Sequence, residues 1–178
     1  ALLQYLVKQP NNKKYNLIIL HALTAVNGME WKLANSIAQL NKIVNAKEVI
    51  SLEGVGSQEI DSDKEPSSYY FSKCSAKKLE KTGISPLNEG IVMGVTGALL
   101  LNKKCNVSAI FAETHSALPD SRAAAKIIEV LDKYLGLKVN YAPLLKKAEG
   151  FEAKLKDLLQ KGQTAHKVKQ EKELSYLG

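Results

Sequence analysis

Arginine is nearly absent from this sequence: Arg122 is the only arginine among 25 basic residues. Arginine is the side chain that most often grips phosphates and reads base edges, because its planar guanidinium donates paired hydrogen bonds. The net charge of +7 is therefore carried by lysines, which we expect to lie mainly on solvated helix faces. This composition disfavours nucleic-acid recognition and leaves an acidic protein surface as the alternative partner of the excess positive charge.

Cysteines and long apolar runs are also scarce. Cys74 and Cys105 are far apart in the sequence and lack metal-ligand spacing, so we expect free thiols in a reducing compartment. No apolar run reaches the roughly 18 residues that a membrane-spanning helix needs, and no signal peptide is evident. These absences predict a cytoplasmic protein that binds neither metal nor membrane. The first residue is Ala1 rather than Met, so we expect a processed or trimmed chain.

Strand patterns alternate with helix patterns along most of the 178 residues. This alternation predicts a single α/β domain over residues 1–160, with helices layered on a largely parallel sheet. Strands are predicted at residues 5–7, 15–23, 47–52, 69–71 and 107–113. Helices are predicted at residues 30–44, 75–81, 97–104 and 120–135, and from residue 143 onward.

Several burial assignments follow from the apolar pattern. The continuous apolar run Leu17–Leu20 predicts a strand buried on both faces, and residues 47–52 predict a second one, ending in a glycine loop at Gly54 and Gly56. Trp31 is expected to anchor the first helix against the sheet, the alternative being exposure at an interface. The helix at 120–135 is expected to bury Ala124, Ile127, Ile128, Leu131 and Leu135.

Two glycines, Gly94 and Gly97, precede a helix and admit two interpretations. Backbone N–H groups at a helix N-terminus attract anions, so the pair could cradle a phosphate. The pattern is neither a complete Walker loop nor a dinucleotide fingerprint. We therefore expect a structural role, in which the glycines permit a sharp turn and close packing.

Acidic residues stand at two places where an α/β fold can bind ligands. Glu113 and His115 follow the predicted strand 107–113, and the carboxyl ends of such strands are common ligand sites. A carboxylate beside an imidazole could perform acid–base chemistry or hold a metal, but no further ligands cluster nearby in sequence. We expect Glu113 to accept backbone hydrogen bonds and Asp120, which follows Pro119, to cap a helix.

The end of the sequence differs in character from the rest. Residues 161–178 are rich in lysine and glutamine, which predicts a flexible basic tail. Its last residues, Leu174–Gly178, are again mostly apolar. An apolar tip on a polar tail has no core to join, so it is a candidate docking peptide.

Four features in one order make the sequence resemble the proteasome assembly chaperone family, in particular its archaeal members. The resemblance spans roughly residues 16–159, with looser similarity at Asn27–Ala34 and Val49–Gly56. The features are the glycine-punctuated segment Gly90–Leu101, the segment Phe111–Thr114 followed by Leu118–Asp120 and a helix start at Ala123–Ala124, the segment Leu131–Tyr141, and the helix Leu144–Leu155.

The resemblance implies a three-layer α/β sandwich, related to phosphorylases and hydrolases, that acts by binding and carries no catalytic residue or cofactor. Archaeal members of the family self-assemble and bind proteasome particles or assembly intermediates. Their C-terminal tails insert into pockets between α subunits of the proteasome ring. The matching residues here are Tyr176 and Leu177, so the resemblance assigns partner binding to Ser175, Tyr176, Leu177 and Gly178. The alternative is a phosphorylase- or hydrolase-like enzyme that acts on a phosphate-bearing or nucleoside ligand near Gly94, Gly97, Glu113 and His115.

The sequence departs from the family pattern in two ways. Gly178 follows Leu177, so Tyr176 is not penultimate, and the residue before it is Ser175 rather than an apolar one. A pocket that reads the terminal carboxylate would be out of register by one residue. The N-terminal glycine-rich strand–helix unit of the family is also missing, which predicts an exposed sheet edge and favours a homo-oligomer.

Overall fold

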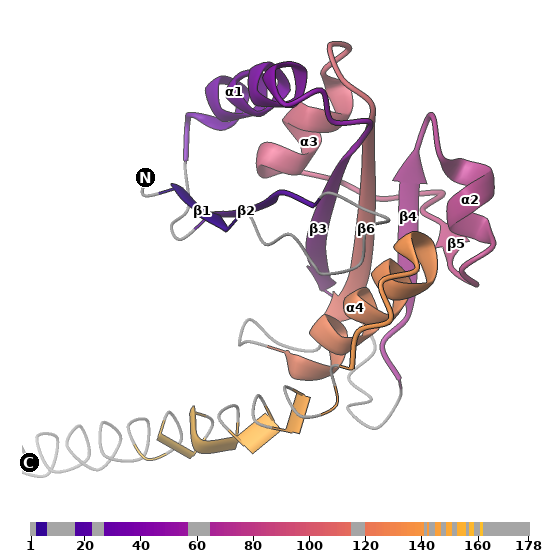
Figure 1. Ribbon diagram of the computed structural model, residues 1–178. Helices are drawn as coiled ribbons and strands as arrows, with labels where there is room; N and C mark the ends of the chain where they lie inside the picture. Colours follow the sequence, from indigo (N-terminus) through magenta and orange to yellow (C-terminus); the bar gives the residue numbers. More distant parts are fainter. Residues whose placement is uncertain are drawn as a thin grey trace, which may run out of the picture.

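The computed structural model describes residues 3–6, 17–22, 27–56, 65–114 and 120–140, together with separate positions between 142 and 161 that are all helical. The described residues form ten elements, in which strands and helices are interspersed as the sequence predicts, with the short strand β5 as an unpredicted addition (Figure 1). They are β1 (Leu3–Leu6), β2 (Ile19–Ala22), α1 (Glu30–Ile43), β3 (Val49–Gly56), β4 (Ser68–Ser72), α2 (Ala76–Glu80), β5 (Ser85–Pro86), α3 (Gly94–Leu101), β6 (Val107–Thr114) and α4 (Ser121–Leu135).

The main sheet has four strands in the order β3-β6-β4-β5. β3 is parallel to β6 and β4 is parallel to β5, whereas β4 and β6 are antiparallel. Helices α1 and α3 lie on one face of this sheet and α4 lies on the other (Figure 1). The predicted α/β fold with helices on both faces of a mostly parallel sheet is therefore confirmed.

Strand β6 is the centre of the fold because both of its edges are paired and both of its faces are covered. Ile110 and Phe111 are completely buried, and each contributes about 1.5–3 kcal/mol through removal of its side chain from water. Successive side chains point to opposite faces. Ile110 thus packs with Ile127 and Val130 of α4, while Val107 packs with the α1 and α3 layer.

Two strands that the sequence pattern predicted to be buried carry exposed apolar side chains instead. Ile18 and Ile19 are 42% and 55% exposed, because β2 pairs, among the described strands, with β1 alone, in a separate two-stranded sheet. Leu52 is 48% exposed, because β3 forms one edge of the main sheet. The prediction that Gly54 and Gly56 form a loop was also wrong, since β3 runs through both and pairs with β6 to its end.

Helix α1 matches its predicted range, but Trp31 does not anchor it. The side chain is 58% exposed, whereas the small residues Ala34 and Ala38 are buried. Because residues four apart lie on one side of a helix, these two alanines form a narrow strip of small side chains that packs against α3. This close packing leaves Trp31 outside the stripe, so the anchoring prediction was wrong.

Helix α4 has the predicted start and end, although its buried face is rotated from the predicted one. Gly136 ends the helix in a left-handed conformation (φ +66°), and its N–H donates to the Asp132 carbonyl at 2.6 Å. Ala124 and Ile128, which we expected in the core, lie outside it. The small residues at the start of α4 let the helix approach the sheet, and the buried positions are Ser121, Ala123, Ile127, Val130 and Tyr134.

Candidate functional site

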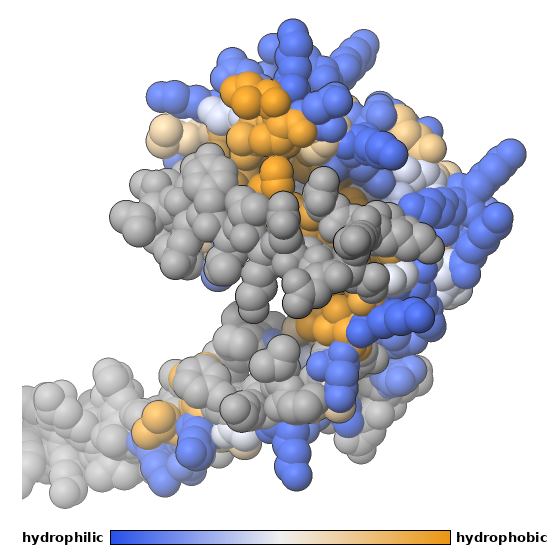
Figure 2. All heavy atoms as spheres, in the orientation of Figure 1, coloured by the Kyte–Doolittle hydropathy of each residue, from blue (hydrophilic) through white to orange (hydrophobic). Residues whose placement is uncertain are grey.

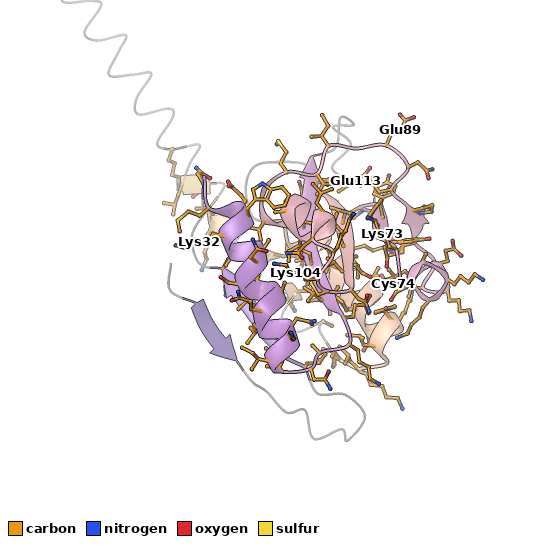
Figure 3. The ribbon with its side chains drawn as sticks, turned by 90° about the horizontal axis from the view of Figure 1, so that it is seen from above. Lys32, Lys73, Cys74, Glu89, Lys104 and Glu113 are labelled. Carbon is orange, nitrogen blue, oxygen red and sulfur yellow. The ribbon has the colours of Figure 1, made fainter. Side chains whose placement is uncertain are left out.

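The carboxyl end of β6, where the sequence placed a candidate ligand site, is occupied by contacts within the fold. Glu113 accepts a hydrogen bond from the Ser67 backbone N–H at 3.2 Å and another from the Tyr69 hydroxyl at 3.0 Å (its position is labelled in Figure 3). Its own N–H donates to the Ser67 carbonyl at 2.9 Å. Both carboxylate oxygens therefore hold the segment that leads into β4, which is the backbone-accepting role that the sequence predicts.

The other half of that candidate site, His115, lies outside the described residues. Asp120 begins the next described segment and caps α4, because its side chain accepts the Ala123 N–H at 2.9 Å. No group of three or more His, Cys, Asp and Glu side chains in the described part of the chain could hold a metal ion.

The two glycines in the first turn of α3, Gly94 and Gly97, serve backbone geometry. Gly94 has a positive φ of +66°, a conformation that residues with a side chain rarely adopt. A Cβ on Gly97 would lie 2.6 Å from the Val92 carbonyl oxygen, so only glycine allows this approach. The Thr96 hydroxyl also lies 2.7 Å from that of Ser51, which ties α3 to β3. The start of α3, which begins at Gly94 rather than after Gly97, is thus packed against its own approach segment and the sheet.

A buried hydroxyl network crosses the opposite face of the sheet. Glu48 accepts hydrogen bonds from Ser108 and, at 2.7 Å, from the Tyr134 hydroxyl. The Ser108 hydroxyl also lies 2.7 Å from that of Ser72. Burial, reinforced by the Glu48 carboxylate, raises the pKa of Tyr134 to about 12. The Lys78 ammonium lies 4.1 Å from the centre of the Tyr134 ring, so this network joins four elements through charge and hydrogen bonding.

Sequence patterns could not have found this network. The Glu48–Ser108 and Glu48–Tyr134 pairs are separated by 60 and 86 residues, and no periodicity links them. The only local signal is an isolated glutamate directly before an apolar strand. The network ties α4 to the sheet through hydrogen bonds.

Both cysteines are free thiols, as the sequence predicts. They line one shallow hollow of about 170 Å³, with Lys73 and Lys103 also at its wall (Cys74 and Lys73 are labelled in Figure 3). The Cys74 thiol donates to the Asn106 side-chain oxygen at 3.3 Å. Burial raises the pKa of the Cys105 thiol, which favours the inert, protonated form there.

Exposed apolar side chains gather instead on the layer formed by α1 and α3 (Figure 2). Met29 and Trp31, at the start of α1, are 48% and 58% exposed. Ile91 and Met93, directly before α3, are 90% and 73% exposed. We refer to these four residues as the apolar rim. Contiguous patches of exposed apolar side chains are typical of surfaces that bind other proteins, and sequence reasoning anticipated exposure here only as the alternative for Trp31.

The chain is similar to known proteins over most of its length. The PAC2 family model matches residues 2–159. The chain belongs to the PAC2 family. Pyrococcus furiosus PbaA, described as an archaeal homolog of proteasome-assembly chaperone, is 33% identical in sequence, with a TM-score of 0.72. That similarity covers 92% of this chain and 72% of the PbaA chain. This PAC2 chain therefore shares most of its length with a proteasome-assembly chaperone homolog.

Two further similarities are weaker, one in sequence identity and the other in the length that it covers. Pyrococcus furiosus PbaB, described as an archaeal proteasome activator, has a TM-score of 0.69 over 90% of this chain and 70% of its own, but at 17% identity it shows likeness of fold alone. An uncharacterized protein of Methanocaldococcus jannaschii is 42% identical over 74 residues, which are 39% of this PAC2 chain and 30% of that protein. This chain thus matches less than a third of the length of that curated relative.

Among the helices that the structure describes, none combines the length and the apolarity that a membrane crossing requires. The tail residues Ser175, Tyr176, Leu177 and Gly178 lie outside the described residues.

Proposed function

We propose that this PAC2 protein is a non-catalytic binding factor for the proteasome, an assembly chaperone whose partners are the α-subunit ring or its assembly intermediates. The observation that carries the proposal is the 33% identity to the PbaA chain over 92% of this chain. Identity of that extent covers both the sheet and the helix layers, so it concerns the whole described fold.

The geometry of the fold supports binding over catalysis. The carboxyl ends of parallel strands are where α/β enzymes bind their ligands, and Glu113 at that end is held by Ser67 and Tyr69. The apolar rim, in contrast, leaves Trp31, Ile91 and Met93 in contact with solvent. A carboxylate held by contacts within the fold, together with apolar side chains exposed to solvent, fits a protein that contacts other proteins.

The finer part of the proposal concerns the tail. We propose that residues 161–178 form a flexible basic extension of the 1–160 domain and that Ser175–Gly178 docks into pockets between proteasome α subunits. Tyr176 supplies an apolar ring with a polar hydroxyl, and Leu177 adds a second apolar contact. Each tip binds weakly, so a cytoplasmic homo-oligomer of this chain gains affinity by presenting several tips to a ring of repeated pockets.

The experiment is a pull-down of proteasome α subunits with the full chain and with a chain that ends at Leu174. The control replaces Ser175–Gly178 with a Gly-Ser sequence of the same length, so that tail length is unchanged. We expect both altered chains to capture at least about tenfold less α subunit, because avidity multiplies the loss at each tip. Equal capture by all three chains would exclude docking through the tail.

A parallel measurement addresses the enzyme alternative. Phosphate and a set of nucleosides are titrated against the full chain while its melting temperature is recorded, since a ligand that binds only the folded state raises that temperature. We expect no shift. A shift with phosphate or with a nucleoside, abolished by Glu113→Gln, would instead indicate a small-molecule site at the end of β6.

A further inference from the structure

A small hollow lies on the α1 and α3 face of the main sheet, lined in part by Leu100 and Val107 of that layer. Its volume is about 170 Å³. The β4–β6 register ends with Ser72 opposite Ser108, so the hollow lies where β4 ends and β6 begins. Glu113 is at the other end of β6. The hollow is therefore separate from the strand end where the sequence placed a candidate ligand site.

Part of the wall of this hollow is apolar. Phe71 of β4, Leu100 of α3 and Val107 of β6 contribute to it, and the Phe71 side chain remains 38% exposed. The volume is close to the roughly 150 Å³ of an engineered apolar cavity that binds benzene. The hollow therefore has room for one apolar side chain of a partner.

Four exposed lysines surround this apolar wall. Lys73 and Lys103 line the hollow themselves, and Lys104 directly follows Lys103 (Lys73 and Lys104 are labelled in Figure 3). The carbonyl of Lys47 accepts a hydrogen bond at 3.4 Å from the side chain of Asn106, which is also part of the wall. We refer to the hollow and these four lysines as the lysine hollow.

The positive charge of the lysine hollow is not neutralised within the described part of the chain. None of its four lysines forms an ion pair or a cation–π contact with another described residue. Glu48, which follows Lys47, instead accepts hydrogen bonds from Ser108 and Tyr134 on the α4 face. Clustered charges of one sign create a local potential that attracts the opposite charge, so the lysine hollow favours an anionic partner.

The side chains favour an acidic protein segment over a nucleic acid. Nucleic-acid sites combine arginines that grip phosphates with aromatic rings on which bases stack. Phe71 is the one aromatic residue of the wall. The single arginine of the chain, Arg122, belongs to α4 on the other face of the sheet. Lysine ammonium groups are compact point charges that pair with carboxylates without a fixed geometry.

We propose that the lysine hollow binds an acidic segment of a partner protein. One apolar side chain of that segment enters the hollow between Phe71 and Leu100, and the carboxylates on either side of it approach Lys73, Lys103 and Lys104. A single exposed ion pair is weak, so the affinity comes from several together and falls as the salt concentration rises. This binding depends neither on the tail nor on a role at the proteasome.

The test is fluorescence anisotropy of a labelled Glu-Glu-Leu-Glu-Glu peptide, titrated with the full chain at low ionic strength. The hollow variant carries Lys73→Glu and Lys103→Glu. The matched control carries Lys32→Glu and Lys154→Glu, at two other exposed lysines, and changes the net charge by the same amount. We expect Kd to weaken at least about tenfold in the hollow variant and less than about twofold in the control.

Two altered peptides and one thiol sharpen the test. Gln-Gln-Leu-Gln-Gln removes the charge and Glu-Glu-Gly-Glu-Glu removes the apolar side chain, and each should bind at least about tenfold more weakly. Cys74 is a free thiol in the wall of the hollow. At a peptide concentration of about ten times Kd, its alkylation by iodoacetamide should slow at least about fivefold, since only the unoccupied protein reacts.

Each other outcome overturns the proposal. Absence of saturable binding, or equal weakening by the hollow variant and the control, would leave at most a general attraction to the net charge. Unchanged alkylation of Cys74 would place the peptide elsewhere. Binding of a single-stranded oligodeoxythymidylate as tightly as the peptide would indicate a nucleic-acid site. If charge reversal lowers the melting temperature, Lys73→Gln with Lys103→Gln replaces it, and unchanged affinity in that folded variant would exclude the lysine hollow.

Discussion

The two faces of the central sheet differ in how completely helices and side chains cover them. The α4 face is closed by a capped helix, with Ile127 and Val130 against the sheet and a hydroxyl network around Glu48. The α1 and α3 face has a smaller core and leaves Trp31 and Met93 exposed. One face therefore holds the fold, and the other carries the exposed apolar side chains through which we propose that the protein contacts a partner.

The largest expected effect is the loss of stability when packing on the α1 and α3 face is disrupted. Gly97→Val should lower the free energy of unfolding by about 1–3 kcal/mol, because forcing a side chain into a filled site displaces its neighbours. Here the new Cβ would meet the Val92 carbonyl oxygen at 2.6 Å. Chemical denaturation measures the change. The control is Gly150→Ala, where a Cβ meets nothing within 4 Å, and a loss there equal to that of Gly97→Val would refute the packing explanation.

The next effect tests the network on the α4 face. Tyr134→Phe keeps the ring but removes the hydroxyl that donates to Glu48 at 2.7 Å, which should cost about 1–2 kcal/mol. Denaturation at neutral pH measures it. A variant as stable as the unaltered protein would show that the hydrogen bond contributes nothing to the fold.

The same residue gives a pH dependence with a defined sign. The pKa of Tyr134 is raised from 10.0 to about 12, so the folded state favours the neutral hydroxyl. Its stabilising contribution is complete below pH 10 and is lost as the pH rises from about 10 to about 12. The stability difference between the unaltered protein and Tyr134→Phe should therefore shrink over that range. A difference that stays constant would contradict the raised pKa.

A smaller effect concerns the cap of α4. Asp120→Ala should destabilise the protein by about 1 kcal/mol, because the N-terminal N–H of Ala123 loses its acceptor. Asp120→Asn keeps an acceptor oxygen and should lose less. Thermal unfolding of the two variants side by side checks the order, and equal losses would point to the charge of Asp120 rather than to its cap.

The smallest stability effect sharpens the comparison most. Trp31→Ser should change the free energy of unfolding by less than about 0.5 kcal/mol, as expected for an exposed side chain. If the apolar rim contacts proteasome α subunits, the same substitution should weaken their capture. Ala38→Ser, at a buried position of the same helix, serves as the opposite control. A strongly destabilised Trp31→Ser would place the indole in a core rather than on a binding surface.

Sequence reasoning predicted the elements whose signals are local. β6 is a continuous apolar run, α1 has apolar residues at helical spacing, and α4 has Asp120 before it and Gly136 after it. It could not predict which strands would be neighbours, because pairing of β3 with β6 joins residues such as Val49 and Val107. The exposure of Leu52 follows from the edge position that this pairing gives to β3, and that of Ile19 follows from the separate pairing of β2 with β1. Neither pairing can be read from the sequence, so both burial predictions failed.

The residues of the candidate site likewise fall into those whose roles the sequence predicts and those whose roles it does not. The roles of Glu113 and Asp120 were predictable because each depends on a strand end or a helix start close by in the sequence. The network of Glu48, Ser108 and Tyr134 depends on tertiary packing alone. The apolar rim could not be predicted from the sequence either, since a tryptophan or methionine at helical spacing usually packs into the core. Here α1 packs closely against α3 through Ala34 and Ala98, and this packing leaves the Trp31 side chain exposed.

The most direct test of the central claim is capture of proteasome α subunits by this chain, measured as binding of the purified subunits to the immobilised full-length protein. The account predicts saturable binding that falls at least about tenfold when Ser175–Gly178 is replaced by a Gly-Ser sequence of equal length. Absence of binding by the full chain, at subunit concentrations up to the high micromolar range, would contradict a role as a proteasome assembly chaperone.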